Sequence, residues 1–579
     1  MTAFLIHNMA PLMFGALIVV MLMGYPVAFA LAAVGIVFGL IGIELGLLQA
    51  TLFQALPERV WGVMSNDTLL AIPFFTFMGL ILERSGMAED LLETVGQLFG
   101  PVRGGLAYAV IFVGALLAAT TGVVAASVIS MGLISLPIML RYGYDRRFAS
   151  GVIAASGTLA QIIPPSLVLI IMADQLGKSV GDMYAGAFIP GIVLTALYAS
   201  YTMGVCVFKP AWAPALPPEA RTLKEPDGSS GSTSLLVLLV ISVIAAVAFA
   251  KYYYPAEAPL DEVIVVATCV GTAVAFFAAL IGKILKLRLL SALAERVVFV
   301  LIPVLALIFL VLGTIFLGVA TPTEGGAMGA TGALVMALAR RRLSWKLLRQ
   351  GMDTTARLTA FVVFILVGAR VFSLTFYGVN GHVWVEELLI GLPGGQLGFL
   401  IVVNILVFFL AFFLDFFELS FIVIPLLGPA AEKLGIDLIW FGVLLGVNMQ
   451  TSFMHPPFGF ALFYLRSVAP TKDYLDKITG KTIARITTGQ IYWGAVPFVI
   501  IQIIMVGLVI LFPQMVMVYK SGESKVDPSK IEIIIPQEEA APPSTGSGYP
   551  GQETEKKTDD EDKALQDAFK AAPAEPAKK

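Results

Sequence analysis

Long apolar segments, separated by short polar ones, alternate along most of this chain. A helix needs about 20 apolar residues to cross a bilayer, so each charge-poor segment of that length predicts one crossing. We expect twelve membrane-spanning helices, at 3–23, 26–43, 68–84, 148–172, 183–208, 235–253, 262–282, 297–318, 322–339, 355–376, 437–462 and 491–512.

Two further apolar segments, 105–140 and 396–428, are too long for one crossing and carry a polar break in the middle. The break is "AATTGVV" at 118–124 in the first and "LDFFELS" at 414–420 in the second. A chain that enters the membrane, turns at polar residues and returns on the same side accounts for both patterns. We therefore predict two re-entrant hairpins.

Adjacent prolines interrupt two of the predicted spans, Pro164–Pro165 within 148–172 and Pro456–Pro457 within 437–462. Proline removes an N–H donor and displaces the carbonyl of the preceding turn, and an unpaired main-chain group costs several kcal/mol in lipid. The prolines are either kinks, which membrane helices tolerate, or breaks that line a cavity where the carbonyls bind a cation. Because both pairs follow a polar cluster, we favour the second hypothesis.

The polar clusters before the prolines offer oxygen ligands for such a cation. Hard oxygen ligands without a dedicated carboxylate cage favour Na⁺ over a divalent transition metal. The side chains that would complete the shell are Ser156 and Thr158 in the first span, and Asn448, Gln450, Thr451 and Ser452 in the second. We expect the proline residues Pro164, Pro165, Pro456 and Pro457 to border the substrate as well.

The same order of elements occurs twice, in opposite orientations across the membrane. Inverted repeats of this kind place a binding site near the bilayer midplane, between discontinuous helices. We therefore predict an all-α polytopic membrane protein with two inverted repeats. The expected parts are a first repeat at 1–208 with its hairpin at 105–140, a cytoplasmic linker at 209–234, an inserted helix pair and basic loop at 235–295, a second repeat at 296–519 with its hairpin at 396–428, and a disordered tail at 520–579.

Composition and charge support a membrane transporter. Of 579 residues, 58% are hydrophobic and only 13% charged, against about 25% charged in an ordinary soluble domain. No GxxxxGK[ST], HExxH or CxxC motif occurs, which argues against P-loop nucleotide hydrolysis and against a transition-metal enzyme. The basic loops fall on one side of this map and are therefore cytoplasmic, which puts both termini outside; these loops are 141–147, 283–288, 340–349 and 464–485.

Asp415 and Glu418 lie at the predicted tip of the second hairpin, where a charge in hydrocarbon would cost roughly 2.5–3.5 kcal/mol. They form either a gate or a proton or cation contact, or the tip reaches water or pairs with Arg370. Arg370 itself either contacts substrate or extends its charge toward the membrane surface. His455, beside the second proline pair, is expected to have a structural role rather than to relay protons.

The tip of the first hairpin carries Thr120, Thr121 and Gly122. Their hydroxyls and exposed main-chain N–H groups could hold a carboxylate, as helix N-termini do. Small residues are also needed simply to turn the chain, so both interpretations stand. Elsewhere, Gly325 and Gly329 have the GxxxG spacing that is typical of close helix packing.

Several blocks of this sequence resemble the large membrane subunit (DctM-like) of the tripartite ATP-independent periplasmic (TRAP) transporters. The resemblance covers most of the chain except the middle insert and the tail, and it points to the larger variety, whose members often carry names for mannitol or chloroaromatic compounds. The blocks are "GYPVAFAL" (24–31), "AIPFFTFMGLILERSGM" (71–87), "SLPIMLRYGYDRRFASGVIAASGTLAQIIPPS" (135–166), "GAFIPG" (186–191), "TPTEGGAMGA" (321–330), "LDFFELSFIVIPLLGP" (414–429) and "PPFGFALFYLRSVAP" (456–470).

The resemblance implies an elevator-type secondary transporter of the ion-transporter superfamily, driven by Na⁺ and located in the bacterial inner membrane. It further implies two partners, a small four-helix membrane subunit and a soluble periplasmic substrate-binding protein that delivers an organic acid. The implied Na⁺ ligands are Thr120, Thr121 and Gly122 with Ser156, Gly157 and Thr158 at one site, and Asp415 with Asn448, Gln450, Thr451 and Ser452 at the other. The first tip, "ATTGVVAAS", departs from the Ser-rich, Asp-bearing tip of many relatives.

Two alternatives to a binding-protein-dependent importer remain. Within the same class, the chain could be an anion permease of the ion-transporter superfamily that works without a binding protein. From another class, it could be an intramembrane enzyme or a scaffold. The absence of paired catalytic motifs argues against the enzyme, and the paired broken helices argue against the scaffold.

Overall fold

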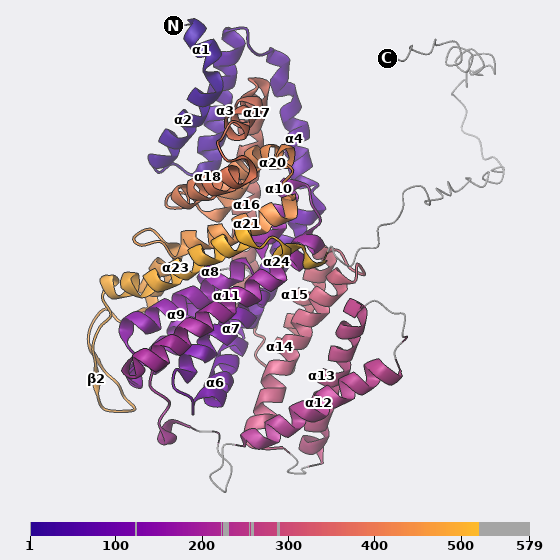
Figure 1. Ribbon diagram of the computed structural model, residues 1–579, viewed down its shortest axis with the longest axis vertical. Helices are drawn as coiled ribbons and strands as arrows, with labels where there is room; N and C mark the ends of the chain where they lie inside the picture. Colours follow the sequence, from indigo (N-terminus) through magenta and orange to yellow (C-terminus); the bar gives the residue numbers. More distant parts are fainter. Residues whose placement is uncertain are drawn as a thin grey trace, which may run out of the picture. The chain divides into compact units, whose positions relative to one another are not determined.

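A computed structural model describes residues 2–121, 124–221, 223, 231–253, 255, 260–285 and 290–519 (Figure 1). Up to the linker, its elements are α1 (Thr2–His7), α2 (Met9–Leu22), α3 (Val27–Glu44), η1 (Ala50–Ala55), α4 (Leu56–Met64), η2 (Asp67–Leu70), α5 (Ala71–Arg84), α6 (Met87–Phe99), α7 (Gly105–Thr121), α8 (Val124–Arg141), α9 (Arg146–Thr158), η3 (Leu159–Gln161), α10 (Leu167–Leu176) and α11 (Val180–Phe208).

The rest of the described chain is also helical, apart from one short β-hairpin. Its elements are η4 (Pro210–Trp212), η5 (Pro218–Ala220), α12 (Ser232–Tyr252), α13 (Leu260–Ile284), α14 (Ala292–Phe316), α15 (Pro322–Ala339), α16 (Trp345–Gly378), α17 (Gly381–Ile390), α18 (Gly395–Leu410), α19 (Phe416–Glu418), the π-helix η6 (Leu419–Val423), α20 (Ile424–Lys433), α21 (Leu438–Gln450), η7 (Thr451–Phe453), α22 (Phe460–Val468), the antiparallel strands β1 (Tyr474–Leu475) and β2 (Thr482–Ile483), α23 (Thr488–Leu511) and α24 (Gln514–Met517).

The predicted fold class is confirmed. Eight helices in the described part of the chain are long and apolar enough to cross a membrane, or ten if each of two bent helix pairs counts as one span. The remaining predicted spans are not among these helices: 3–23 is divided between α1 and α2, 322–339 forms the uninterrupted α15, and 148–172 and 437–462 are each broken. Both breaks lie at the prolines, where the sequence predicts them. Conversely, α8 falls on the predicted hairpin 105–140 and yet is one of the eight.

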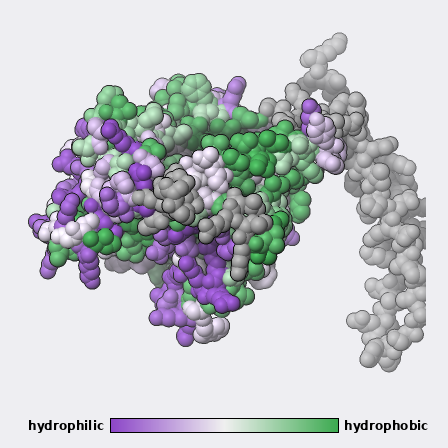
Figure 2. All heavy atoms as spheres, turned by 90° about the horizontal axis from the view of Figure 1, so that it is seen from below, coloured by the Kyte–Doolittle hydropathy of each residue, from purple (hydrophilic) through white to green (hydrophobic). Residues whose placement is uncertain are grey.

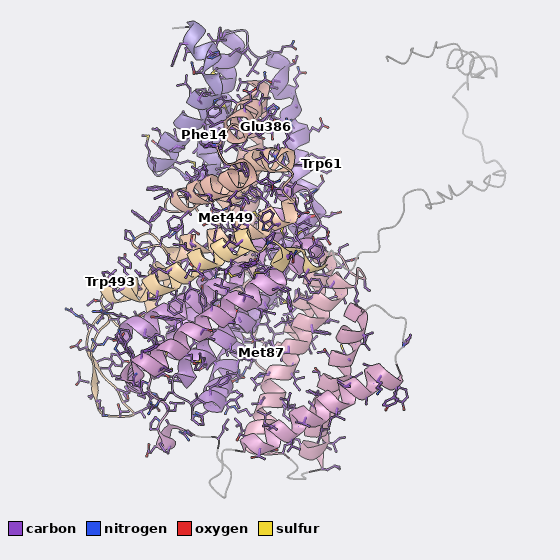
Figure 3. All side chains as sticks on the ribbon, viewed as in Figure 1. Phe14, Trp61, Met87, Glu386, Met449 and Trp493 are labelled. Atoms are coloured by element: carbon purple, nitrogen blue, oxygen red, sulfur yellow. The ribbon has the colours of Figure 1, made fainter. Side chains whose placement is uncertain are left out.

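Three helices, α4, α6 and α17, are absent from the map drawn from hydropathy. They are short, and α6 begins with Glu89 and Asp90, so a search for charge-poor windows passes over them. Two of them match each other in the repeats, since α6 follows α5 and α17 follows α16. In the view of Figure 3, Met449 lies between Glu386 of α17 and Met87 of α6.

The two repeats exchange equivalent contacts. Helix α3 of the first repeat packs along α16 of the second, while their counterparts α15 and α5 pack on each other. Reciprocal contacts of this kind are the signature of a two-fold relation. Each of these two interfaces joins a helix of one repeat to a helix of the other, and the second interface is formed by the counterparts of the helices in the first. The helix packing therefore shows the inverted repeat.

Glycine allows these helices to approach closely. A Cβ at Gly368 of α16 would lie 2.4 Å from the carbonyl oxygen of Ala28 in α3, and one at Gly329 of α15 would lie 2.4 Å from the sulfur of Met78 in α5. The Thr375 hydroxyl adds a hydrogen bond of 2.8 Å to the Gly35 carbonyl oxygen across the first interface. The GxxxG prediction of close packing is confirmed at Gly329.

One apolar core runs through both repeats, whereas the inserted pair α12 and α13 packs beside it. The pair contacts α14 through a small separate cluster of Leu238, Ala275, Ala279 and Val298. Few of its other described side chains are buried, and Cys269 is exposed. Seen from below, hydrophilic and hydrophobic residues gather in separate regions of the surface (Figure 2).

We predict that Gly368→Ala destabilises the protein by about 1–3 kcal/mol, the usual cost of overpacking a tight interface, because the new methyl group meets the backbone of α3. Thermal unfolding of the detergent-purified chain measures the effect. The matched control is Gly507→Ala in α23, where nothing lies within 4 Å of the added carbon. If both variants melt like the wild type, the α3–α16 interface is not tightly packed.

Candidate ion and substrate site

The two broken helices end in the same way. Helix α9 passes through the 3₁₀ turn η3 into an irregular segment before α10, and α21 passes through η7 into a similar segment before α22. The bond between the two prolines is cis in each break.

Some of the carbonyl groups at the breaks have local partners, contrary to the expectation that they are free. The Ser166 hydroxyl donates to the Gln161 carbonyl oxygen, and the backbone N–H groups of Met454 and His455 both donate to the Thr451 carbonyl oxygen. A turn of 3₁₀ geometry and one serine thus satisfy these carbonyls. The ligands available to a cation are therefore mainly side-chain oxygens.

Equivalent residues of the two repeats bind each other at the centre of the molecule. Thr158 and Gln450 precede their proline pairs by the same number of residues, and the Gln450 Nε2 donates to the Thr158 Oγ1 at 3.1 Å across 292 residues of chain. Gln502 of α23 donates to Tyr198 of α11 at 2.9 Å beside them. All four side chains are fully buried. Because Thr158 and Gln450 are equivalent residues of the two repeats, the pseudo-two-fold axis that relates the repeats passes between them.

Each broken helix is held between the two arms of its own hairpin. A Cβ at Gly157 would lie 2.3 Å from the side chain of Val128, and the Ser420 hydroxyl lies 3.9 Å from the sulfur of Met449. Gly157 and Met449, and likewise Val128 and Ser420, are separated by the 292 residues that also separate Thr158 from Gln450. The hairpins therefore hold the two breaks in equivalent ways.

The first arm of each hairpin also contacts its polar cluster. A Cβ at Gly114 would lie 2.7 Å from that of Ser156, so α7 packs directly on this serine. In the second repeat, the Asn448 amide donates to both the carbonyl and the side-chain oxygen of Asn404 in α18, at 2.8 and 3.0 Å. Asn404 was not among the residues singled out in the sequence.

Several buried polar atoms beside the breaks have no hydrogen-bond partner in the described part of the chain. They include the Ser156 Oγ, the Gln450 Oε1, the Gln502 Oε1 and both polar side-chain atoms of Gln161. The hydroxyls of Thr158, Thr451 and Ser452 donate to backbone carbonyls at 2.6–2.8 Å. This leaves the oxygen lone pairs of Thr451 and Ser452 as acceptors, whereas the Thr158 oxygen already accepts from Gln450 at 3.1 Å and Gln502 at 3.5 Å. Unpaired buried polar atoms are costly, and this set of oxygens fits the chemistry of Na⁺.

A cavity of about 250 Å³ lies between the two hairpins and the two breaks. Residues next to the first tip and at the second tip border it, together with both 3₁₀ turns, α5, α16 and α22. The lining residues are Ile72, Thr76, Val124, Ala125, Gln161, Leu167, Leu358, Phe361, Val362, Asp415, Phe416, Phe417, Phe453, Phe460 and Tyr464.

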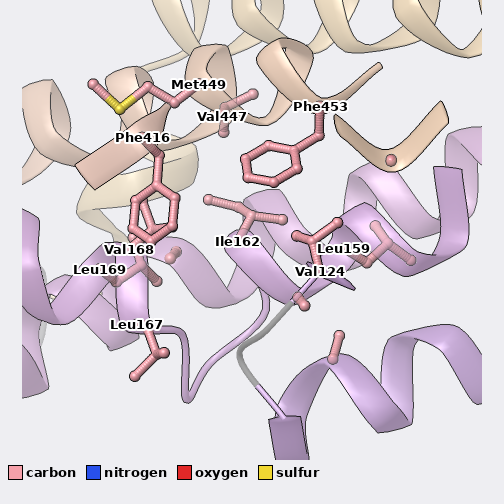
Figure 4. Close-up of a cluster of buried hydrophobic side chains, with 14 of the residues drawn as sticks. Val124, Leu159, Ile162, Leu167, Val168, Leu169, Phe416, Val447, Met449 and Phe453 are labelled. Carbon is pink, nitrogen blue, oxygen red and sulfur yellow. The ribbon is translucent and has the colours of Figure 1, made fainter. Parts of the chain in front are cut away.

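The floor of this region is apolar and closely packed. Figure 4 shows Phe416 from the second hairpin and Phe453 from η7 facing the segment of the first repeat that carries Leu159, Ile162 and Val168. All five side chains belong to the main core. Apolar packing therefore surrounds the few polar groups at the junction of the repeats.

Asp415 and Glu418 cap the helix that begins at the second tip. The Asp415 carboxylate accepts the Glu418 N–H at 3.0 Å, and the Glu418 carboxylate accepts the Asp415 N–H at 3.0 Å. Neither carboxylate pairs with Arg370, which lines a different cavity. Of the alternatives left open by the sequence, pairing with Arg370 is therefore wrong, whereas a carboxylate facing the cavity holds for Asp415.

The comparison with known families decides the identity of the chain. Residues 14–515 match the family model described as "Tripartite ATP-independent periplasmic transporter, DctM component". The chain belongs to this family.

Among curated relatives of this DctM-family chain is the C4-dicarboxylate TRAP transporter large permease protein of Rhodobacter capsulatus, 26% identical over 488 residues, 81% of this chain and 92% of the relative. The sialic acid TRAP transporter large permease protein of Vibrio cholerae is 23% identical over 492 residues, 85% and 93% of the two chains. The crystal structure of the Alcanivorax borkumensis YdaH transporter aligns with a TM-score of 0.47 at 15% identity, over 81% of this chain and 90% of that one.

The predicted site residues of this DctM-family chain fall into three groups. Ser156, Gly157, Thr158, Asn448, Gln450, Thr451 and Ser452 come together at the two breaks, and Asp415 reaches the cavity. Of the four prolines, Pro164 and Pro165 are buried and none lines the cavity. Gly122 and the side chains of Thr120 and Thr121 lie outside the described residues.

The residues that sequence analysis missed are Gln161, Thr76, Tyr464, Tyr198 and Gln502. Gln161 carries a usable signal, because it is a polar residue three positions before a proline pair in an apolar segment. The others come from separate helices. His455 stacks on Phe412 with ring centroids 4.3 Å apart, and its ring nitrogens have no partner among the described residues.

A polar clamp outside the membrane-spanning helices joins the first hairpin to the second repeat. Arg141, at the end of α8, pairs with Asp476 of the β1–β2 loop at 3.0 Å, and the Thr479 hydroxyl donates to the same carboxylate at 2.6 Å. These hydrogen bonds, from Thr479 first and then Arg141, lower the pKa of Asp476 to about 2. The carboxylate is therefore ionised at neutral pH.

We predict that this clamp stabilises the protein fully above pH 4 and that its contribution is lost between about pH 4 and pH 2. A folded-state pKa below the unfolded value gives stability that disappears as the carboxylate is protonated. The measurement is the difference in melting temperature between wild type and Asp476→Asn in detergent. This difference should shrink as the pH falls through that range, and Thr479→Val should move the loss to higher pH. A difference that does not change with pH would contradict the assignment.

Proposed function

We propose that this chain is the transport subunit of a Na⁺-coupled secondary importer of an organic acid in the bacterial inner membrane. The observation that carries the proposal is the meeting of two hairpins and two broken helices around one cavity, with unpaired side-chain oxygens at the breaks. Inverted-repeat transporters bind substrate and ion at such a junction. The basic loops are cytoplasmic in this proposal, and both termini face the periplasm.

Membership in the family supports the proposed partners and substrate class. Relatives are named for C4-dicarboxylate and for sialic acid, both organic acids. A soluble periplasmic binding protein delivers the acid, and a small four-helix membrane subunit completes the transporter. Movement of the hairpins and broken helices as one elevator body carries the cavity across the membrane.

Charge at the cavity accounts for coupling between the ion and the acid. Asp415 is the carboxylate that lines the cavity, and none of the other lining residues is charged. An organic anion entering the cavity alone would be repelled by that carboxylate. Na⁺ bound at the breaks offsets this repulsion, so each ligand raises the affinity for the other by the same factor.

We predict that uptake into proteoliposomes containing both partners depends on an inward Na⁺ gradient and is unaffected by ATP. The substrate for the assay is the ligand that co-purifies with the periplasmic binding protein, identified by mass spectrometry. Uptake that persists unchanged when choline replaces Na⁺ would reject Na⁺ coupling. Uptake at the full rate without the binding protein would instead favour an anion permease that works alone.

We also predict that Asn448→Ala or Thr451→Ala raises the Na⁺ concentration for half-maximal uptake by about tenfold, which corresponds to roughly 1.4 kcal/mol of lost ion binding. His455→Ala, whose side chain packs between aromatic rings, serves as the matched control and should change this concentration little. If the histidine variant has the larger effect, the ligand assignment at the second break is wrong.

A further inference from the structure

A second cavity, of about 180 Å³, lies beside the second hairpin and is not used by the proposed ion site. It is bordered by α3, α4, α10, α16 and the segment from η6 into α20. Its lining residues are Leu31, Arg59, Gln175, Leu366, Ala369, Arg370, Phe372, Ser373, Phe376, Tyr377, Phe421, Ile422, Pro425 and Leu426.

Helix α16 and the second hairpin line both cavities. The cavity between the tips touches Phe361 of α16 and Phe417 of the hairpin, whereas the second touches Arg370 of α16 and Phe421 of the hairpin. Nine residues of helix separate Phe361 from Arg370, which is roughly 13 Å at 1.5 Å per residue. The second cavity therefore lies further along the seam between α16 and the second hairpin.

The charge of the second cavity is opposite to that of the first. Arg59 and Arg370 both line it, and none of its lining residues is acidic. Neither arginine forms an ion pair within the described residues. Asp174, the neighbour of the lining residue Gln175 in the chain, accepts hydrogen bonds from Asn66 at 2.6 Å and Gln175 at 2.7 Å.

Two guanidinium groups in a partly apolar cavity suit a small carboxylate. Arginine presents planar donors that match a carboxylate in a bidentate way, and its charge is permanent. The Tyr377 and Ser373 side chains add polar groups to the same lining. A cation has no acidic ligand among these lining residues, so the cavity discriminates by charge.

We propose that Arg59 and Arg370 form a carboxylate-binding site that holds the organic acid before it enters the cavity between the hairpin tips. This inference rests on the proposed function, because it takes the bound carboxylate to belong to the organic acid that the protein transports. Arg59 on α4 is exposed, and Arg370 on α16 is half-buried. The acid passes from a positive site to a cavity that accepts it once Na⁺ is bound.

The first test uses the wild-type full chain in detergent, without Na⁺ and without partners. Phenylglyoxal modifies accessible arginines, and peptide mass spectrometry gives the modification rate at each one. We expect succinate to slow the modification of Arg370 by at least about threefold, as charge-assisted binding to a carboxylate shields the guanidinium. Arg357, exposed on the same helix but outside the cavity, is the internal control.

The second test measures binding of radiolabelled succinate to the same preparation. Arg370→Gln together with Arg59→Gln should raise the dissociation constant by about tenfold or more, the loss expected when two charge-assisted contacts are removed. Arg370→Lys should weaken binding less, and Arg357→Gln should bind as the wild type does. The protection experiment needs no variant, so it stays decisive if a substituted chain fails to fold.

The outcomes separate this proposal from the proposed function. Because both tests omit Na⁺ and the partner proteins, failure of Na⁺-coupled uptake leaves their result unchanged. Succinate binding that is equally tight in the double variant, or no protection of Arg370 by succinate or acetate, would overturn the site. Protection by phosphatidylglycerol in mixed micelles, with none by succinate, would assign the arginines to a lipid headgroup and also reject the proposal.

Discussion

A backbone N–H or C=O group cannot be left without a partner inside a bilayer, and the centre of this protein is organised by that rule. Two helices are interrupted by prolines within an apolar core, and each interruption is enclosed by hairpin arms and by the other repeat. A serine hydroxyl satisfies the Gln161 carbonyl, and a 3₁₀ turn satisfies that of Thr451. Several buried polar atoms without a hydrogen-bond partner among the described residues, such as the Ser156 Oγ, lie at the breaks.

Enclosing the breaks requires helices to approach more closely than side chains ordinarily allow. Gly114 and Gly157 let the first hairpin lie directly on its broken helix, and Gly368 lets α16 lie on the backbone of α3. The packing of the two repeats on each other also brings Gln450 within hydrogen-bond distance of Thr158, at the pseudo-two-fold axis. Small residues and symmetry therefore produce one polar centre from two separate stretches of chain.

Charge then divides the seam between α16 and the second hairpin into two parts. Asp415 gives the cavity between the tips a negative group, and Arg59 and Arg370 give the neighbouring cavity two positive ones. In the function proposed above, a cation and an organic acid have different preferred positions along this seam. That separation is the physical basis on which the movement of one ligand can depend on the presence of the other.

The sequence by itself determined most of the apolar helices, the proline breaks and the polar clusters beside them, because each is a local pattern of hydropathy or backbone chemistry. That the two hairpins enter and leave the membrane on the same side stays a prediction. The sequence also pointed to the family. It did not reveal α6 or α17, because these helices are short and contain charged residues. It also did not reveal Asn404, Gln502 and Tyr198, because their hydrogen-bond partners come from distant helices. Only the tertiary structure decided that Arg370 lines a cavity together with Arg59 and not with Asp415. Pairing between side chains far apart in the chain depends on how helices cross, and no local pattern encodes that.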